Sequence, residues 1–220
     1  MIDLHTHTSY SDGAYSLAEH IRRAEQCGYR VIGITDHGDA SNVESIIQQV
    51  KKGVEENNKF AKIKAICGIE LTHVLPESIG ELVKQCRAYG AQLVNVHGET
   101  IVEPVPEGTN MAAIDAGVDV LCHPGFITEE EAAYAAEKGV FLEITSRAGH
   151  SFTNAHVFRV AKATGAKLVF DNDAHTHSDL VSQDLAEKIM LGCGIPRNEI
   201  PVIFAHSEEI ARRLLQGLFI

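Results

Sequence analysis

The most regular feature of the sequence is a series of short apolar runs, rich in β-branched residues, that alternate with segments of helical periodicity. Such runs, uninterrupted by polar residues, are typical of parallel strands buried on both faces. Seven strands are therefore predicted, the first of them abbreviated. They cover residues 2–4, 31–34, 63–69, 93–96, 118–121, 140–144 and 168–170.

The segments between these runs carry signals for helix starts and helix ends. A Ser or Thr followed three residues later by Glu matches the capping box, in which each side chain bonds a free backbone N–H group. Three pairs predict helix starts in this way: Ser16 with Glu19, Ser78 with Glu81, and Thr128 with Glu131. Glycine tolerates the left-handed backbone found at helix ends. Four helices are predicted to stop at Gly28, Gly90, Gly117 and Gly139.

This strand and helix unit repeats about seven times, and no linker rich in Pro, Gly or Ser divides it. One domain over residues 1–220 is expected. Such alternation produces either an open doubly wound sheet or a closed barrel. Nearly every predicted strand ends in a His, Asp or Glu, and only in a barrel do all strand ends face a common centre. We therefore predict an α/β fold, a TIM-like barrel of seven strands and slightly irregular.

The polar residues at these strand ends form the candidate site. His and carboxylate side chains are the donors that Zn, Mn and Fe accept, and two adjacent ions need a bridging carboxylate. A lone His on a strand is more often a hydrogen-bonded core or surface group, so the argument rests on their joint placement. Unpartnered buried carboxylates would be costly, and metal ions remove that cost. The nine candidates are His5, His7, Asp12, His37, Glu70, His97, His123, Asp173 and His175.

Composition narrows the classes of protein that fit. Of 220 residues, 45% are hydrophobic and 22% are charged, as in an ordinary globular protein, but 12 are His, which is an excess. A net charge of −11 argues against general nucleic-acid binding. The five scattered cysteines indicate buried thiols rather than disulfides or a metal knuckle. Neither a membrane span nor a signal peptide is visible, so a cytoplasmic protein without a membrane partner is expected.

The series HTHTSYSDG, TDH, GIE, VNVHGE, CHPG and DNDAH resembles the motifs of the polymerase and histidinol phosphatase (PHP) family, over residues 5–175. The resemblance implies a distorted (β/α)7 barrel with a trinuclear metal centre. It assigns one ion to His5, His7, Glu70 and Asp173, a second to Asp12, His37 and His175, and a third to Glu70, His97 and His123. Glu70 is then the bridging ligand. Many members have His where this chain has Asp12, which shifts that site toward Mn or Fe over Zn.

Hydrolysis of a phosphoester fits such a centre, with hydroxide activated by two or three divalent ions as the nucleophile. Glu70 and Asp12 are expected to serve catalysis as ligands. His177 is expected either to contact the metal ligands without binding an ion itself or to act as a general acid. Arg147 is either a phosphate ligand or an exposed loop residue, and His150 either a phosphate or leaving-group donor or a surface group.

The remaining polar residues receive supporting roles. Asp36 and Asp171 are expected to orient imidazoles. Glu99 and Glu103 would exclude bulky anions or contact a substrate amine, although solvated acids are the default. Four histidines are assigned to structural or surface positions: His20, His73, His156 and His206.

The favoured function is a stand-alone phosphatase for a small phosphomonoester, with histidinol phosphate as the candidate that the resemblance names. The first alternative is a phosphodiesterase or 3′-exonuclease, which predicts a basic groove. The others are a noncatalytic, metal-stabilised module and an amidohydrolase, which usually needs a bridging Lys that these strand ends lack. Nothing in the sequence indicates an oligomeric state.

Overall fold

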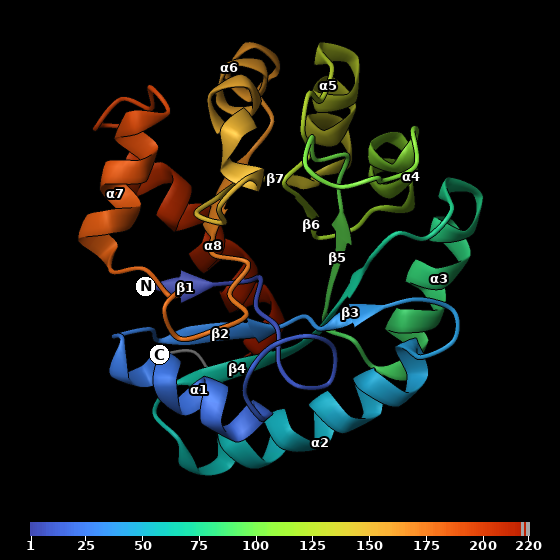
Figure 1. Cartoon of the computed structure of the whole chain (residues 1–220), viewed down its shortest axis with the longest axis vertical. Helices are drawn as coiled ribbons and strands as arrows, with labels where there is room; N and C mark the ends of the chain where they lie inside the picture. The colour runs from blue at the N-terminus through green and yellow to red at the C-terminus, as the bar shows by residue number, and fades with distance from the viewer. Residues whose placement is uncertain (217, 219–220) are drawn as a thin grey trace.

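Seven parallel strands curl into a nearly closed barrel surrounded by helices, as Figure 1 shows in a view along the barrel. The computed structural model describes residues 1–216 and 218. The strand order is β1-β2-β4-β5-β6-β7-β8, and a short strand, β3, pairs with β4 off this path. The strands are β1 (Ile2–Asp3), β2 (Val31–Ile34), β3 (His37–Gly38), β4 (Lys64–Leu71), β5 (Leu93–His97), β6 (Val120–Cys122), β7 (Phe141–Thr145) and β8 (Leu168–Asp171).

The predicted fold class is confirmed, and each of the seven expected strands is found within two residues of its predicted limits. The second strand is broken, because the chain leaves β2 at Ile34 and resumes parallel pairing with β4 only at His37. That break was not predicted. It displaces His37 along β4 until it pairs with Glu70.

Helices follow the strands and cover the outside of the barrel. They are α1 (Leu17–Gln26), α2 (Val43–Phe60), α3 (Pro76–Tyr89), α4 (Thr109–Ala116), α5 (Glu129–Lys138), a 3-10 turn η1 (His150–Thr153), α6 (Asn154–Thr164), α7 (Gln183–Gly192) and α8 (Ile200–Leu215). Their apolar faces and the outer faces of the strands form one large core. No helix of the described residues is long and apolar enough to cross a membrane.

The predicted helix limits are met in part. Thr128 and Glu131 form the expected capping box, and Gly90, Gly117 and Gly139 end their helices with left-handed backbone. Ser16 precedes α1 without a side-chain cap bond. The prediction for Ser78 was wrong, because α3 begins at Pro76, whose fixed φ suits the first helical turn.

The interior of the barrel changes from apolar to polar along the strands. Side chains two residues apart in a strand point to the same face. On β4 the inward face carries Ile66 and then Glu70, and on β5 it carries Leu93 and then His97. The apolar residues at the start of each strand form a second, smaller core. The polar residues at the other end form the candidate site.

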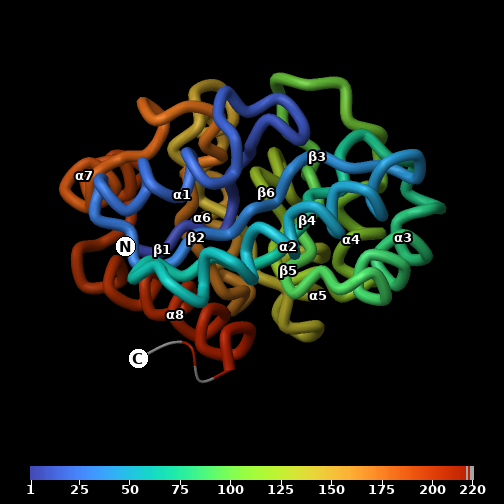
Figure 2. The backbone as a smooth tube through the Cα atoms, turned by 90° about the horizontal axis from the view of Figure 1, so that it is seen from below, coloured from blue at the N-terminus to red at the C-terminus, as the bar shows by residue number. Residues whose placement is uncertain are grey.

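Helix α8 closes the apolar end of the barrel. Its residues Ile210, Ala211 and Leu215 pack into the smaller core. Figure 2 shows α8 at one end of the molecule and the loop after β1 at the opposite end. One end is therefore sealed by a helix, and the polar end stays open to solvent.

The barrel closes between its first and last strands through a narrow seam. No ladder joins β1 to β8 among the described residues, and the bridge from Thr6 to Ala174 stands in its place. The N–H of His7 donates to the carbonyl of Ala174 at 2.9 Å, and the N–H of Leu4 donates to Asp171 Oδ1 at 2.6 Å. The seam lies directly between residues of the candidate site.

Candidate metal centre

All nine candidate ligands lie at the polar end of the barrel. His5 and His7 follow β1, His37 lies in β3, Glu70 lies in β4, and His97 ends β5. The others come from the loops after β1, β6 and β8: Asp12, His123, Asp173 and His175. The strand ends thus bring together side chains from most of the length of the chain, as the sequence predicts.

One group is centred on two buried carboxylates. His5 Nε2 lies 3.2 Å from Glu70 Oε1 and 3.7 Å from Asp173 Oδ1. His7 Nε2 lies 3.0 Å from Asp173 Oδ1 and 3.8 Å from Glu70 Oε2. The four side chains are at most 4% exposed. This is the set that the resemblance assigned to the first ion.

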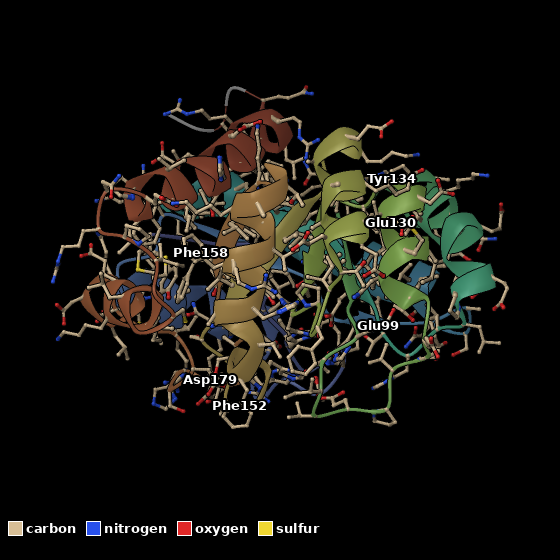
Figure 3. The ribbon with its side chains drawn as sticks, turned by 90° about the horizontal axis from the view of Figure 1, so that it is seen from above. Glu99, Glu130, Tyr134, Phe152, Phe158 and Asp179 are labelled. Carbon is tan, nitrogen blue, oxygen red and sulfur yellow. The ribbon has the colours of Figure 1, made fainter. Side chains whose placement is uncertain are left out.

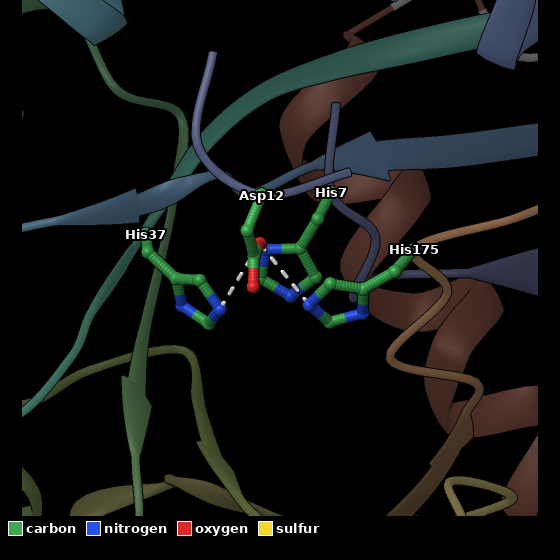
Figure 4. Close-up of side chains that lie close together, drawn as sticks. All are labelled: His7, Asp12, His37 and His175. Atoms are coloured by element: carbon green, nitrogen blue, oxygen red, sulfur yellow. Dashed lines mark ion pairs between the residues drawn. The ribbon is translucent and has the colours of Figure 1, made fainter. Parts of the chain in front are cut away.

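A second group contains Asp12, His37 and His175, with His7 between the imidazoles (Figure 4). Asp12 Oδ1 lies 3.5 Å from His37 Nε2 and 3.2 Å from His175 Nε2. The His7 ring stacks on His175 at a centroid distance of 4.3 Å and lies tilted against His37 at 4.1 Å. The turn after Asp12 packs closely on the backbone of His7. Only glycine fits at Gly13, because a Cβ there would meet the His7 carbonyl oxygen at 2.3 Å. His7 therefore belongs to both groups.

The third group differs from the expected set. His123 Nε2 lies 3.8 Å from Glu70 Oε1, as expected of a shared ligand. His97 instead faces Glu103, with His97 Nε2 3.3 Å from Glu103 Oε2. His150 joins the group, and its ring stacks on His123 at 4.1 Å. His150 is buried at the polar end of the barrel and is not a surface residue.

Glu143 is a buried site residue that the sequence reasoning missed. Glu143 Oε1 lies 2.7 Å from His5 Nδ1, and its other oxygen accepts the His123 backbone N–H at 2.8 Å. It follows Phe141 by two residues and so shares the inward face of β7. A carboxylate on the inward face of an otherwise apolar strand was the signal that could have identified it.

The partners that orient the imidazoles are not the expected ones. Asp36 accepts from the backbone and hydroxyl groups of Thr8 and Ser11, so it fixes the loop after β1. Asp171 accepts from the backbone of Leu4 at the seam. Neither bonds an imidazole, so the expectation for both was wrong. Glu143 and Thr72 serve instead, at 2.7 Å from His5 Nδ1 and His37 Nδ1.

The buried donors lack hydrogen-bond partners, and this observation tests whether metal ions fit. Buried polar atoms in proteins are almost always hydrogen-bonded, because an unpaired one costs free energy. Here several are unpaired together and turn toward one another. They are His5 Nε2, both ring nitrogens of His7 and of His123, Glu70 Oε1 and Asp173 Oδ1. Imidazole nitrogens and carboxylate oxygens grouped in this way fit divalent metal ions.

The electrostatics of the cluster point the same way. Burial opposes the charge on Glu70, but the His5 and His37 imidazoles outweigh it and hold the pKa of Glu70 well below its usual value. Burial likewise opposes a charge on His37, yet Glu70 and Asp12 raise its pKa to about 10. Burial, reinforced by His37, lowers the pKa of His7 to about 4. The carboxylates therefore attract positive charge, and cations can take the place of protons there.

A cavity of about 450 Å³ opens over the cluster. Arg147 lines it and, among the described residues, is the one Lys or Arg that does so. Its Nε lies 3.8 Å from Asp173 Oδ2, and its Nη1 donates to Asp179 at 3.4 Å. In Figure 3 Asp179 lies with Phe152 and Glu99 toward one end of the molecule. The guanidinium thus stands at the mouth of the site, held by two carboxylates.

The structure places His177 away from the cavity. Its Nδ1 lies 2.7 Å from the Tyr15 hydroxyl in an exposed pair, and it is not among the cavity-lining residues. His73, expected to be structural or on the surface, does line the cavity, and its Nε2 lies 3.1 Å from Glu103 Oε2. His20 is fully buried in α1, and neither ring nitrogen has a hydrogen-bond partner.

Three further residues have structural contacts. Glu99 was expected to face solvent or substrate, but it accepts from the backbone N–H groups of Gly108 and Asn110 at the start of α4. His156 and His206 bond main-chain carbonyls, at Ile127 and Leu168, as expected of structural groups.

Comparison with known proteins identifies the family. The model of the PHP domain matches residues 3–123, more than half of the chain. The chain belongs to the PHP domain family. The match ends at His123, so the part of the site formed by β7 and β8 lies beyond it, including Glu143, Asp173 and His175.

Relatives of this PHP protein extend over nearly its full length. It is 43% identical to an uncharacterized protein of Methanocaldococcus jannaschii, over 96% of this chain and 99% of that one. It is 28% identical to a probable phosphatase of Shewanella halifaxensis, over 89% and 86%. It is 25% identical to the DNA polymerase/3′-5′ exonuclease PolX of Bacillus subtilis, over 79% of this chain but 34% of that protein.

Solved structures confirm the barrel. A chain of archaeal ribonuclease P with mature tRNA matches with a TM-score of 0.70 and 16% identity, over 97% of this chain and 90% of that one. A putative histidinol phosphatase of Listeria monocytogenes matches with a TM-score of 0.58 and 10% identity, over 81% and 97%. At these identities the likeness concerns the fold alone.

Proposed function

We propose that this PHP protein is a metal-dependent phosphoesterase that hydrolyses a small phosphomonoester. The observation that carries the proposal is the cluster of buried, unpaired nitrogen and oxygen donors beneath a cavity lined by Arg147. The names of relatives support the reaction class, because several proteins matched over most of their length are called probable phosphatases.

The nine predicted ligands would hold two or three divalent ions, Zn, Mn or Fe. The first group of residues would hold one ion, and the Asp12 group would hold a second (Figure 4). Bound ions would supply positive charge for phosphate oxygens and lower the pKa of a water molecule toward neutrality. Glu70 is the residue best placed to be shared between the first and third groups, because its Oε1 lies 3.2 Å from His5 Nε2 and 3.8 Å from His123 Nε2.

Arg147, whose cationic side chain lines the cavity, would bind and orient the substrate. The planar guanidinium of Arg147 has several donors, and two parallel N–H bonds suit a phosphate. Asp179 anchors the loop behind Arg147 by accepting from the backbone of His175 and Thr176. The phosphate would therefore enter between Arg147 and the buried donors, in line with the opening of the cavity.

The walls of the cavity favour a small substrate. Its volume of about 450 Å³ is in the range of small-molecule sites. Asp39 lines it beside the neutral side chains of Asn42 and Thr72, so a bulky polyanion would meet negative charge there. The Asp39 carboxylate would instead suit a substrate amine, and this keeps histidinol phosphate as the named candidate within the class.

A phosphodiesterase or 3′-exonuclease is the alternative, and the similarity to the PolX protein of Bacillus subtilis favours it. Such an enzyme needs a positively charged groove for the nucleic-acid backbone. The net charge of −11 and the acidic cavity walls count against one. We therefore rank nucleic acid below a small phosphorylated molecule as the substrate.

A substrate panel tests the proposal. Protein reconstituted separately with Zn²⁺, Mn²⁺ and Fe²⁺ is assayed against p-nitrophenyl phosphate, histidinol phosphate, nucleoside monophosphates, bis-p-nitrophenyl phosphate and a 3′-labelled oligonucleotide. We expect turnover of monoesters alone, and the Glu70→Gln variant should lose nearly all of it. Turnover restricted to the diester and the oligonucleotide would establish the alternative, and turnover of none would refute both.

A further inference from the structure

We infer that Glu103 and His150 are metal ligands, and that with His97 and His123 they form an ion site whose carboxylate comes from a loop instead of a strand. The inference deepens the proposed metal dependence and rests on it. Neither residue belongs to the nine predicted from the sequence motifs.

The three imidazoles are held so that their free nitrogens face one another. His97 Nδ1 bonds the Gly98 carbonyl at 3.1 Å, and His150 Nδ1 bonds the Thr100 hydroxyl at 2.7 Å. Bonds at one ring nitrogen of this kind fix the ring and leave the other nitrogen for a metal. One ring nitrogen each of His97, His123 and His150 lies within 4.8 Å of the other two.

Glu103 faces two of these rings, His97 and His150, at distances that suit a shared ion better than hydrogen bonds. Its Oε2 lies 3.3 Å from His97 Nε2, and its Oε1 lies 3.4 Å from His150 Nε2. Hydrogen bonds between such groups are usually about 2.7 to 2.9 Å long. Donors bound tetrahedrally to one ion at about 2.0 to 2.1 Å lie about 3.4 Å apart. The spacing is therefore that of neighbouring ligands.

His123 supplies independent evidence for a ligand at this position. It is 2% exposed, and neither of its ring nitrogens has a hydrogen-bond partner. The ring is pressed between His97 and His150, at centroid distances of 4.3 and 4.1 Å. Burying an imidazole with both nitrogens unpaired is costly, and an ion shared with its neighbours removes the cost.

The loop between β5 and α4 is built to present Glu103. One end is fixed by Glu99, which bonds the start of α4, and by Gly125, where a Cβ would meet the Glu99 carbonyl oxygen at 1.8 Å. The bond from Thr100 to His150 ties the same loop to the turn after β7. Glu103 itself is 37% exposed, so it is the donor of this site that solvent reaches most easily.

Metal binding measured without substrate tests the inference. Metal-free protein is titrated with Zn²⁺ in competition with a chromophoric chelator, and bound zinc is counted by mass spectrometry after desalting. The test variants are Glu103→Gln and His150→Gln, and the matched control is Glu107→Gln, which is exposed on the same loop. Thermal unfolding of each metal-free variant checks that the fold is retained.

We expect each test variant to bind one ion at least about tenfold more weakly, because ligand-shell changes cost about 10- to 100-fold. The other ions and the Glu107→Gln control should match the wild type. Unchanged binding in both test variants would overturn the inference, as would loss of all ions together or wild-type protein that binds none. A protein that loses one ion as expected but hydrolyses no phosphomonoester would keep this inference and refute the proposed function.

Discussion

Several of the candidate ligand side chains depend on neighbours that hold them in one orientation. Glu143 is the most deeply placed of these neighbours, because it contacts His5 and the backbone of His123 with its two oxygens. Two residues at the site, His123 and Asp173, also have positive φ values of 28° and 51°. Such backbone is unfavourable without glycine and is concentrated at functional positions. The cluster is thus fixed by strained backbone as well as by side-chain contacts.

Glu143→Gln should weaken metal binding while leaving the fold intact. The amide keeps the size of the side chain, but one of the two acceptor oxygens is replaced by an NH2 group, which is a donor. That NH2 group must face either the His123 N–H or His5 Nδ1, which is also a donor when His5 Nε2 binds an ion. We expect the affinity for at least one ion to fall about 10- to 100-fold. Chelator competition measures this, with the exposed Glu137→Gln as control. Equal affinities would show that Glu143 does not orient His5.

His20 should make stability depend on pH. Burial lowers its pKa to about 4 in the folded protein, against 6.5 for an ordinary histidine. Below pH 6.5 the His20 side chain therefore binds a proton in the unfolded chain but stays neutral in the folded protein. The free energy of unfolding consequently falls as the pH drops from 6.5 to 4, by about 3 kcal/mol from this group. Urea unfolding of metal-free wild type and His20→Leu should show a shallower loss in the variant. Identical pH profiles would contradict the assignment.

For single residues, the sequence predicts which side chains gather at the site better than it predicts their orientation. The convergence of the nine candidate residues could be predicted because strand ends in a barrel share one rim. Glu103 and His150 could not be assigned, because their positions depend on contacts between two loops, such as Thr100 with His150. His177 illustrates the opposite case, since its nearness in sequence to His175 does not bring it to the cavity.

Among the elements, α8 and the strands it covers are joined by one buried carboxylate. Asp119, just before β6, accepts from the backbone of Val94 at 2.8 Å, from Arg87 of α3 at 2.8 Å and from Arg213 of α8 at 2.6 Å. It is 4% exposed and lies just before the start of β6, at the end of the barrel that α8 covers. Its role is therefore in packing and is separate from the metal centre.

Asp119→Ala should destabilise the protein without changing its metal content. The Val94 N–H would lose its buried acceptor, and two ion pairs would be lost, which together cost about 2 to 3 kcal/mol. Calorimetry of the metal-free form should show the melting temperature about 5 to 10 °C lower. Asp115→Ala, at an exposed carboxylate paired with Lys138, is the control and should change little. Loss of bound metal in Asp119→Ala would contradict the separation.

The elements were predictable where local signals and burial agreed. Apolar runs located the seven strands, and Thr128 with Glu131 located α5. Ser78 failed because Pro76 starts α3 two residues earlier. The break between β2 and β3 also has no local signal, since it follows from how Asp36 binds the loop after β1.

For the whole molecule, the weakest closure of the barrel and the metal centre coincide. The seam between β1 and β8 has the bridge from Thr6 to Ala174 in place of a ladder. Donors stand on both of its flanks, with His5 and His7 on one side and Asp173 and His175 on the other. Bound ions would therefore cross-link the first strand to the last. A closed barrel could be predicted from the alternation together with the polar residues at the strand ends, but the position of this seam could not.

Removing the metal should lower the melting temperature of the whole protein. An ion present at 100 times its dissociation constant stabilises the folded form by about 2.7 kcal/mol. For a chain of this size each kcal/mol corresponds to about 2 to 4 °C, so one such ion should contribute about 5 to 10 °C. Calorimetry before and after chelation, and again after Zn²⁺ or Mn²⁺ is restored, measures this. An unchanged melting temperature after chelation would mean that no bound ion cross-links β1 to β8.

The placement of these donors also bears on how the protein is made. A nascent chain that has not yet emerged beyond β7 lacks Asp173 and His175, so the ribosome-bound form offers an incomplete donor set. Ion capture at the seam would accordingly wait until β8 and His175 have been synthesised and β8 meets β1. The supply of metal in the cell would then set how strongly the seam of newly synthesised protein is stabilised and how well that protein resists proteases.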